Sequence, residues 1–86
     1  MRFELGRVVA TPGGLDTFGH EGVYALLRRH AGGDWGDVDG HDRRANEQAL
    51  ATGTRLFSAY DTAAGRVWII TEADRSSTCV LLPSEY

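Results

Sequence analysis

Two kinds of hydrophobic spacing distinguish a helical region, residues 11–52, from a strand-forming region that follows it, residues 55–82. Within residues 11–30 and 40–52, apolar side chains recur at three- and four-residue intervals, as they do on one face of a helix. The clearest such stripe consists of Val23, Leu26, Leu27 and His30. From residue 55 onward, apolar and β-branched residues alternate or form short blocks, which is typical of strands.

Capping residues mark the expected ends of the first helices. Thr11 suits an N-cap and Pro12 suits the first helical position, so a short helix is predicted to begin there. Gly19 is expected to stop it. A second helix, which carries the apolar stripe, is then predicted over residues 21–30.

A third helix is predicted over residues 40–52, with a weaker apolar stripe. Asp37 or Asp39 would cap its start, and Asp42 would lie near the positive end of its dipole. Gly53 is a natural C-terminal stop. The weak stripe indicates that this helix lies shallowly on the domain.

The strands set the expected architecture. Four are predicted, over residues 2–10, 55–60, 67–71 and 78–82, the first with a possible bulge at Gly6. Short turns join the last three strands into an antiparallel meander. We therefore expect one two-layer α+β domain over residues 1–86, with two or three short helices on one face of an antiparallel sheet, in the order β-α-α-α-β-β-β.

Composition narrows the class of partner and the compartment. The net charge is −3 and all nine basic residues are arginine, so the chain lacks the basic footprint of a nucleic-acid-binding protein. Its mild acidity is compatible with a basic protein partner. A single cysteine, Cys79, excludes an internal disulfide. The chain shows no leader and no apolar run near the ~20 residues that span a bilayer, so we expect a cytoplasmic protein without membrane contact.

The thirteen residues from His30 to Asp42 concentrate most of the candidate chemistry, with two histidines, four aspartates, four glycines and a tryptophan. An EF-hand register that places Gly40 at position 6 fails, because Trp35 falls at position 1 and Asn46 at position 12. The two histidines are eleven residues apart with no cysteine nearby, which does not suit zinc. We therefore predict a glycine-hinged connection in which Trp35 packs beneath the loop, with no metal or cofactor.

A second polar cluster lies at the last predicted hairpin. Glu72, Asp74 and Arg75 gather there at one end of the sheet. We expect Arg75 to pair locally with one of the two carboxylates rather than to touch a substrate, and exposed pairs of this kind contribute only about 0–1 kcal/mol. Cys79, within an apolar strand, is expected to be inert packing rather than a nucleophile.

Five runs carry a resemblance to a known family: Val8–Gly13, Arg29–Asp37, Asp42–Glu47, Ile70–Ser76 and Leu81–Pro83. Together they resemble a family of small uncharacterised bacterial proteins of plasmids, phages and other mobile elements. Its members are often labelled plasmid-related protein or type I restriction endonuclease subunit M. A methyltransferase subunit needs a cofactor fold that 86 residues do not hold. The resemblance implies a counter-defence setting, in which small proteins bind host machinery.

The first functional hypothesis is therefore a non-enzymatic protein-binding protein, an inhibitor of a nucleic-acid-targeting defence system of the anti-CRISPR or anti-restriction type. It would bind through an acidic face around the loop and the third helix, with Trp35 as an aromatic anchor. The candidate partner-binding residues are Asp34, Trp35, Asp37, Asp39, Asp42, Arg43 and Glu47.

Two alternatives stay open. One is a small metal-dependent hydrolase or nuclease, whose ligands would be His30, Asp34, Asp37 and His41. The other is a homodimer formed by pairing an exposed edge of the sheet, in which the loop binds no ligand. The chain could thus be a monomer or a homodimer.

Overall fold

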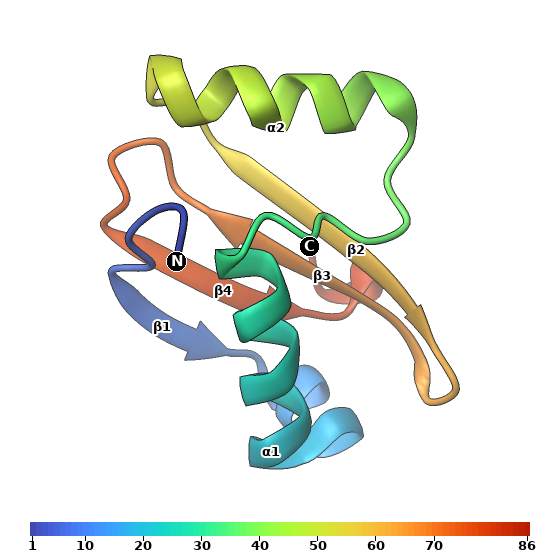
Figure 1. The fold of residues 1–86 in the computed structure, drawn as a ribbon. Coiled ribbons are helices and arrows are strands. Elements are labelled where there is room, and N and C mark those ends of the chain that lie inside the picture. The colour runs from blue at the N-terminus through green and yellow to red at the C-terminus, as the bar shows by residue number, and fades with distance from the viewer.

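A computed structural model describes residues 1–86 and shows a four-stranded sheet with one helix across a face and a second helix along an edge (Figure 1). The elements in chain order are β1 (Arg7–Ala10), α1 (Pro12–Ala31), α2 (Gly40–Thr52), β2 (Leu56–Thr62), β3 (Gly65–Thr71), β4 (Ser77–Leu81) and the 3₁₀ turn η1 (Pro83–Glu85). This is the predicted α+β class. Neither helix has the length and apolar content needed to cross a membrane.

The sheet has the strand order β1-β4-β3-β2 and is mixed rather than antiparallel. β2, β3 and β4 form the predicted antiparallel meander. β1 pairs with β4 in parallel, with Arg7 opposite Ser77 and Ala10 opposite Val80. The expectation of a wholly antiparallel sheet is therefore wrong. In the sequence, both helices lie between β1 and the meander, and a connection of that length permits parallel pairing.

α1 joins the first two predicted helices into one element. Thr11 Oγ1 accepts a hydrogen bond from the backbone N–H of Gly14 at 3.1 Å, and Pro12 occupies the first turn, as predicted. Gly19, with φ 69° and ψ 172°, produces a kink instead of an end. The protein therefore has two helices rather than three, and the second begins as expected after its N-cap Asp39 and ends at the left-handed Gly53.

β1 is shorter than predicted because residues 1–6, hereafter the arm, leave the sheet and turn toward α1. The backbone N–H of Arg2 donates to the carbonyl of Ala31 at 2.7 Å, and the ring of Phe3 stacks on Trp35. Gly6 allows this change of direction with φ 65°, and a Cβ at that position would lie 2.3 Å from the carbonyl oxygen of Arg75. The arm thus covers part of the sheet instead of extending it.

The core has two parts, one under each helix. Under α1 the buried residues are Val23, Leu26, Leu27, Tyr60, Val67, Ile69 and Val80. Beside α2 they are Trp35, Val38, Ala49, Leu56 and Ala59. The connection between the helices therefore belongs to the core through Trp35 and Val38, which fixes the position of the loop that follows α1.

Arg75 does not pair with Asp74 or Glu72, which corrects the prediction for this hairpin. Its backbone has φ 61°, and its guanidinium donates to four backbone carbonyls. The acceptors are Ala49, Thr54, Glu72 and Ala73. Glu72 instead pairs with Arg55 at 3.2 Å. Arg75 lies at the C-terminal end of α2, where unpaired carbonyls attract a cation, and so links that helix to the sheet.

Candidate functional site

Trp35 is a core residue in this structure. Its side chain is 1% exposed, and its indole N–H donates to Glu47 Oε2 at 2.9 Å. Phe3 and His30 pack against its ring. A ring buried to this degree offers no surface to a partner, so any aromatic anchor must be sought among the exposed residues.

The aspartates of the loop organise the loop itself. Asp34 accepts from Arg29 Nε at 2.7 Å, and this hydrogen bond is the main reason that the pKa of Asp34 is lowered. Asp37 Oδ2 accepts from the backbone N–H of Asp61 at 2.8 Å, and Asp39 Oδ1 caps α2 through the N–H of Asp42 at 2.8 Å. Asp34 Oδ1 also accepts from the backbone N–H of Gly36 at 3.1 Å, so each of these three carboxylates holds backbone in place.

The remaining predicted residues lie on α2. Glu47 pairs with Arg2 at 3.0 Å, and the hydrogen bonds from Arg2 and then Trp35 lower its pKa. Arg43 donates to the carbonyl of Val38 at 3.4 Å, and Asp42 lies 3.7 Å from the ring of His41. Residues 34–48 contain five acidic and two basic residues, which accounts for the net charge of −3. These acidic residues are mostly exposed, but much of their charge is engaged within the chain.

The four residues of the metal-dependent alternative do not come together. His30 is 0% exposed, with Nδ1 2.6 Å from Ser58 Oγ and Nε2 2.9 Å from Thr71 Oγ1, so both ring nitrogens are engaged. A different group, Asp39, His41 and Asp42, has ligand atoms within 4.8 Å of one another. It is a solvent-facing cluster at the start of α2, where Asp39 already serves as the N-cap.

The outer edge of β2 is closed by the loop and by α2. The backbone groups of Ala59 pair with the carbonyl of Trp35 at 3.2 Å and with the N–H of Asp37 at 2.6 Å. The buried side-chain amide of Asn46, on α2, pairs with the backbone of Phe57. It accepts from the Phe57 N–H at 3.0 Å and donates to the Phe57 carbonyl at 2.7 Å. This edge therefore has little capacity to pair with another strand.

The outer edge of β1 is open. Arg7 N–H donates to the carbonyl of Ser76, and Thr11 N–H donates to that of Val80, both at 2.9 Å. Because backbone groups alternate in direction along a strand, Val8 and Ala10 direct their N–H and C=O groups away from β4. No element lies outside β1 in Figure 1. The four strands thus have one closed edge and one open edge.

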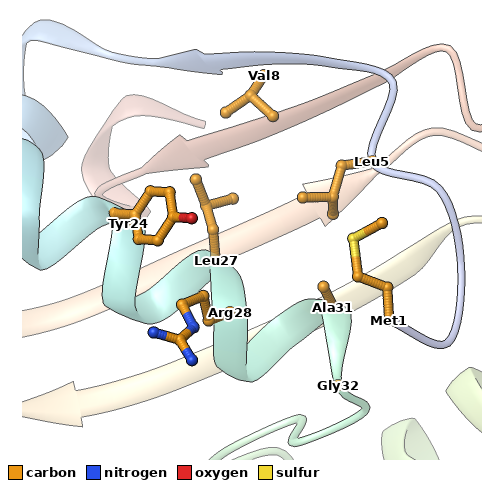
Figure 2. Close-up of a pocket in the computed structure, with 8 residues that line it drawn as sticks. All are labelled: Met1, Leu5, Val8, Tyr24, Leu27, Arg28, Ala31 and Gly32. Carbon is orange, nitrogen blue, oxygen red and sulfur yellow. The ribbon is translucent and has the colours of Figure 1, made fainter.

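An apolar hollow of about 550 Å³ lies beside the open edge, between β1, the arm and α1 (Figure 2). Six of its eight lining residues are hydrophobic, and the only charged one is Arg28. Tyr24 is 65% exposed and Val8 43% exposed, so two of its apolar side chains are open to a partner. Figure 2 shows Tyr24 and Leu27 on α1 facing Val8 and Leu5 across the hollow. This arrangement is suited to binding, and it presents no pair of nucleophile and base.

This hollow was not predicted from the sequence, although two signals for it are present there. Tyr24 interrupts the polar side of the α1 stripe with a large aromatic ring, and Val8 and Val9 are consecutive valines in a strand with one buried face. Both valines are exposed, at 43% and 41%. Of these side chains, Tyr24 and Val8 both line the hollow, and a patch of exposed apolar side chains that includes an aromatic ring is typical of an interface.

Comparison with protein-family models, with curated proteins and with solved structures gives no significant match to this chain. The site is therefore interpreted from its own geometry. That geometry consists of an open strand edge, an apolar hollow next to it, and a loop whose polar groups are used to close the opposite edge.

Proposed function

We propose that this protein is a non-enzymatic protein-binding module that takes up an extended segment of its partner along β1. The observation that carries the proposal is the open edge of β1 lying directly beside the apolar hollow. An added strand would bond to the outward backbone groups of Val8 and Ala10. Its inward side chains would enter the hollow, as in other cases of strand addition, where backbone bonds supply affinity and pockets supply specificity.

The contrast between the two sheet edges supports this proposal. Exposed strand edges promote unwanted pairing, and proteins usually block them. Here the loop and α2 close the β2 edge, while β1 is left open with two exposed valines. The difference is explained if the β1 edge is used for binding.

The biological setting is part of the same proposal. The resemblance to proteins of mobile elements favours a host protein as partner, and an inhibitor of a nucleic-acid-targeting defence system would act through such binding. The acidic surface of residues 34–48 would then meet a basic region of the partner away from the strand bound at β1, since complementary charge mainly affects association rate and specificity.

Selection from a random peptide library displayed on phage tests the proposal. We expect the selected peptides to lose at least about tenfold in affinity for the Val8→Pro variant, because proline removes an outward N–H that an added strand needs. Tyr24→Ala should weaken binding to a similar extent through the loss of an apolar wall. Affinity is measured by fluorescence polarisation, and the melting temperature of each variant confirms that it is folded.

The matched control is Asp42→Asn, which removes a charge from the acidic surface and leaves β1 untouched. We expect the selected peptides to bind it with wild-type affinity. Peptides that bind Val8→Pro and Tyr24→Ala normally but lose affinity for Asp42→Asn would place the binding site on the acidic surface and contradict the proposal.

A further inference from the structure

We infer that the strand taken up by β1 is acidic, with carboxylates on either side of an apolar residue that fills the hollow. The inference rests on the proposed function and adds the chemistry of the partner. Three observations support it. Two arginines beside the site are unpaired, they lie on opposite sides of the sheet relative to Val8, and pairing β1 with a second copy would bring two arginines near each other.

Two arginines beside the site have no partner within the chain. Six of the nine arginine side chains donate hydrogen bonds to carboxylates, carbonyls or a tyrosine hydroxyl. Among the other three, Arg7 lies on β1 and Arg28 lines the hollow. Neither makes an ion pair, and both are exposed. The charged side chains that line the hollow and β1 are therefore both positive, although the exposed carboxylates of Glu4 and Glu21 lie nearby and the protein as a whole is acidic.

The alternation of side chains along β1 places these two arginines on different sides of an added strand. Val8 faces the hollow on the α1 side of the sheet, so Arg7 faces the opposite side. A partner residue opposite Val8 would enter the hollow, and its immediate neighbours would lie on the side of Arg7. The next residues face the α1 side again, where Arg28 is found. Acidic residues at both kinds of position would each meet an arginine.

A second copy of the chain fits this edge less well. Antiparallel pairing of two β1 strands about Val8 would bring both Arg7 side chains to the same face of the joined sheet. The two Arg7 side chains would be diagonal neighbours on that face, within reach of each other because arginine is long, and their like charges would repel. The charge around the edge thus favours a different protein with an acidic strand over self-association.

Three synthetic peptides of the pattern Thr-X-X-Ile-X-X-Thr, in which X is glutamate, glutamine or lysine, test the inference. Titration into ¹⁵N-labelled full-length protein gives the affinity from the amide shifts of Val8 and Ala10. We expect the glutamate peptide to bind about fivefold more tightly than the glutamine peptide, and the lysine peptide to bind weakest. In the double variant Arg7→Gln/Arg28→Gln, the three affinities should become nearly equal.

The outcomes separate the inference from the proposed function. If the glutamate and glutamine peptides bind the wild type equally, the inference that the partner strand is acidic is wrong. The proposal of strand addition to β1 is then unaffected. Absence of amide shifts with all three peptides would overturn strand addition itself. If the protein elutes from a sizing column as a homodimer and Val8→Pro elutes as a monomer, the strand that pairs with β1 is a second copy of the chain. That result would overturn the acidic partner.

Discussion

Replacing Trp35 by alanine is expected to lower the free energy of unfolding by about 3–5 kcal/mol, the usual cost of truncating a large buried aromatic residue. The indole ring is 1% exposed and lies at the centre of the core beside α2. The substitution would also remove the hydrogen bond to Glu47 and the contact with Phe3, which holds the arm. Urea denaturation followed by circular dichroism measures the change.

The matched control is Tyr24→Ala, which removes an aromatic ring that is 65% exposed. A surface substitution of this kind should change the free energy of unfolding by less than about 0.5 kcal/mol. If Trp35→Ala unfolded at the same urea concentration as the wild type, Trp35 would not be a core residue, and the partner-anchor role expected from the sequence would have to be restored.

Lowering the pH from 7 to 5 is expected to reduce the free energy of unfolding by about 2 kcal/mol through His30 alone. Burial lowers the pKa of His30 to about 4, whereas an unfolded histidine titrates near ~6.5. Between these values the unfolded chain binds more protons than the folded one. The contribution of neutral His30 to the free energy of unfolding is therefore fully present above the unfolded pKa. It is lost progressively as the pH falls toward the folded pKa.

The non-titrating variant His30→Gln isolates this effect. It should be less stable than the wild type at pH 7, because the glutamine amide replaces the ring imperfectly between Ser58 and Thr71. Its stability should change much less between pH 7 and pH 5, where carboxylates with lowered pKa values, such as Glu85 beside Thr11, stay ionised. The measurement is the urea midpoint of the wild type and of His30→Gln at both pH values. If both proteins lose the same stability between pH 7 and pH 5, His30 is not the source of the effect.

The buried histidine also connects the core to the proposed binding site. Thr71, bonded to His30, lies 2.7 Å from the hydroxyl of Thr78, which donates to the carbonyl of Leu5 at 2.7 Å. Leu5 belongs to the arm and lines the hollow. Protonation of His30 would therefore disturb a hydrogen-bond chain that ends at the wall of the site.

Local signals in the sequence predicted most of the elements correctly. The caps Thr11, Asp39 and Gly53 act through atoms of their immediate neighbours, so their effect could be inferred without knowing the fold. The same holds for the meander, because its hairpin turns are short. Gly19 was the exception, since a glycine with positive φ can end a helix or kink it, and only the packing of α1 on the sheet decides between the two.

The structural features that could not be predicted from the sequence depend on contacts between distant parts of the chain. The parallel pairing of β1 with β4 joins residues about seventy positions apart, and no local pattern specifies its direction. Arg75 is surrounded by carboxylates in the sequence but donates to carbonyls brought to it by α2. The hollow likewise forms only when the arm meets α1. The partner-binding site was predicted in the polar loop because its charged residues are contiguous in the sequence. In the structure, its carboxylates mostly stabilise the fold.

Amide hydrogen exchange with a bound peptide is the most direct test of the central claim, that a partner strand pairs with β1. In the free protein the amides of Val8 and Ala10 should exchange quickly, since they face outward from the edge strand. Binding of a selected peptide should slow both, while Phe57 and Ala59 on the closed edge should respond only weakly. Unchanged exchange at Val8 and Ala10 in the saturated complex would contradict strand addition.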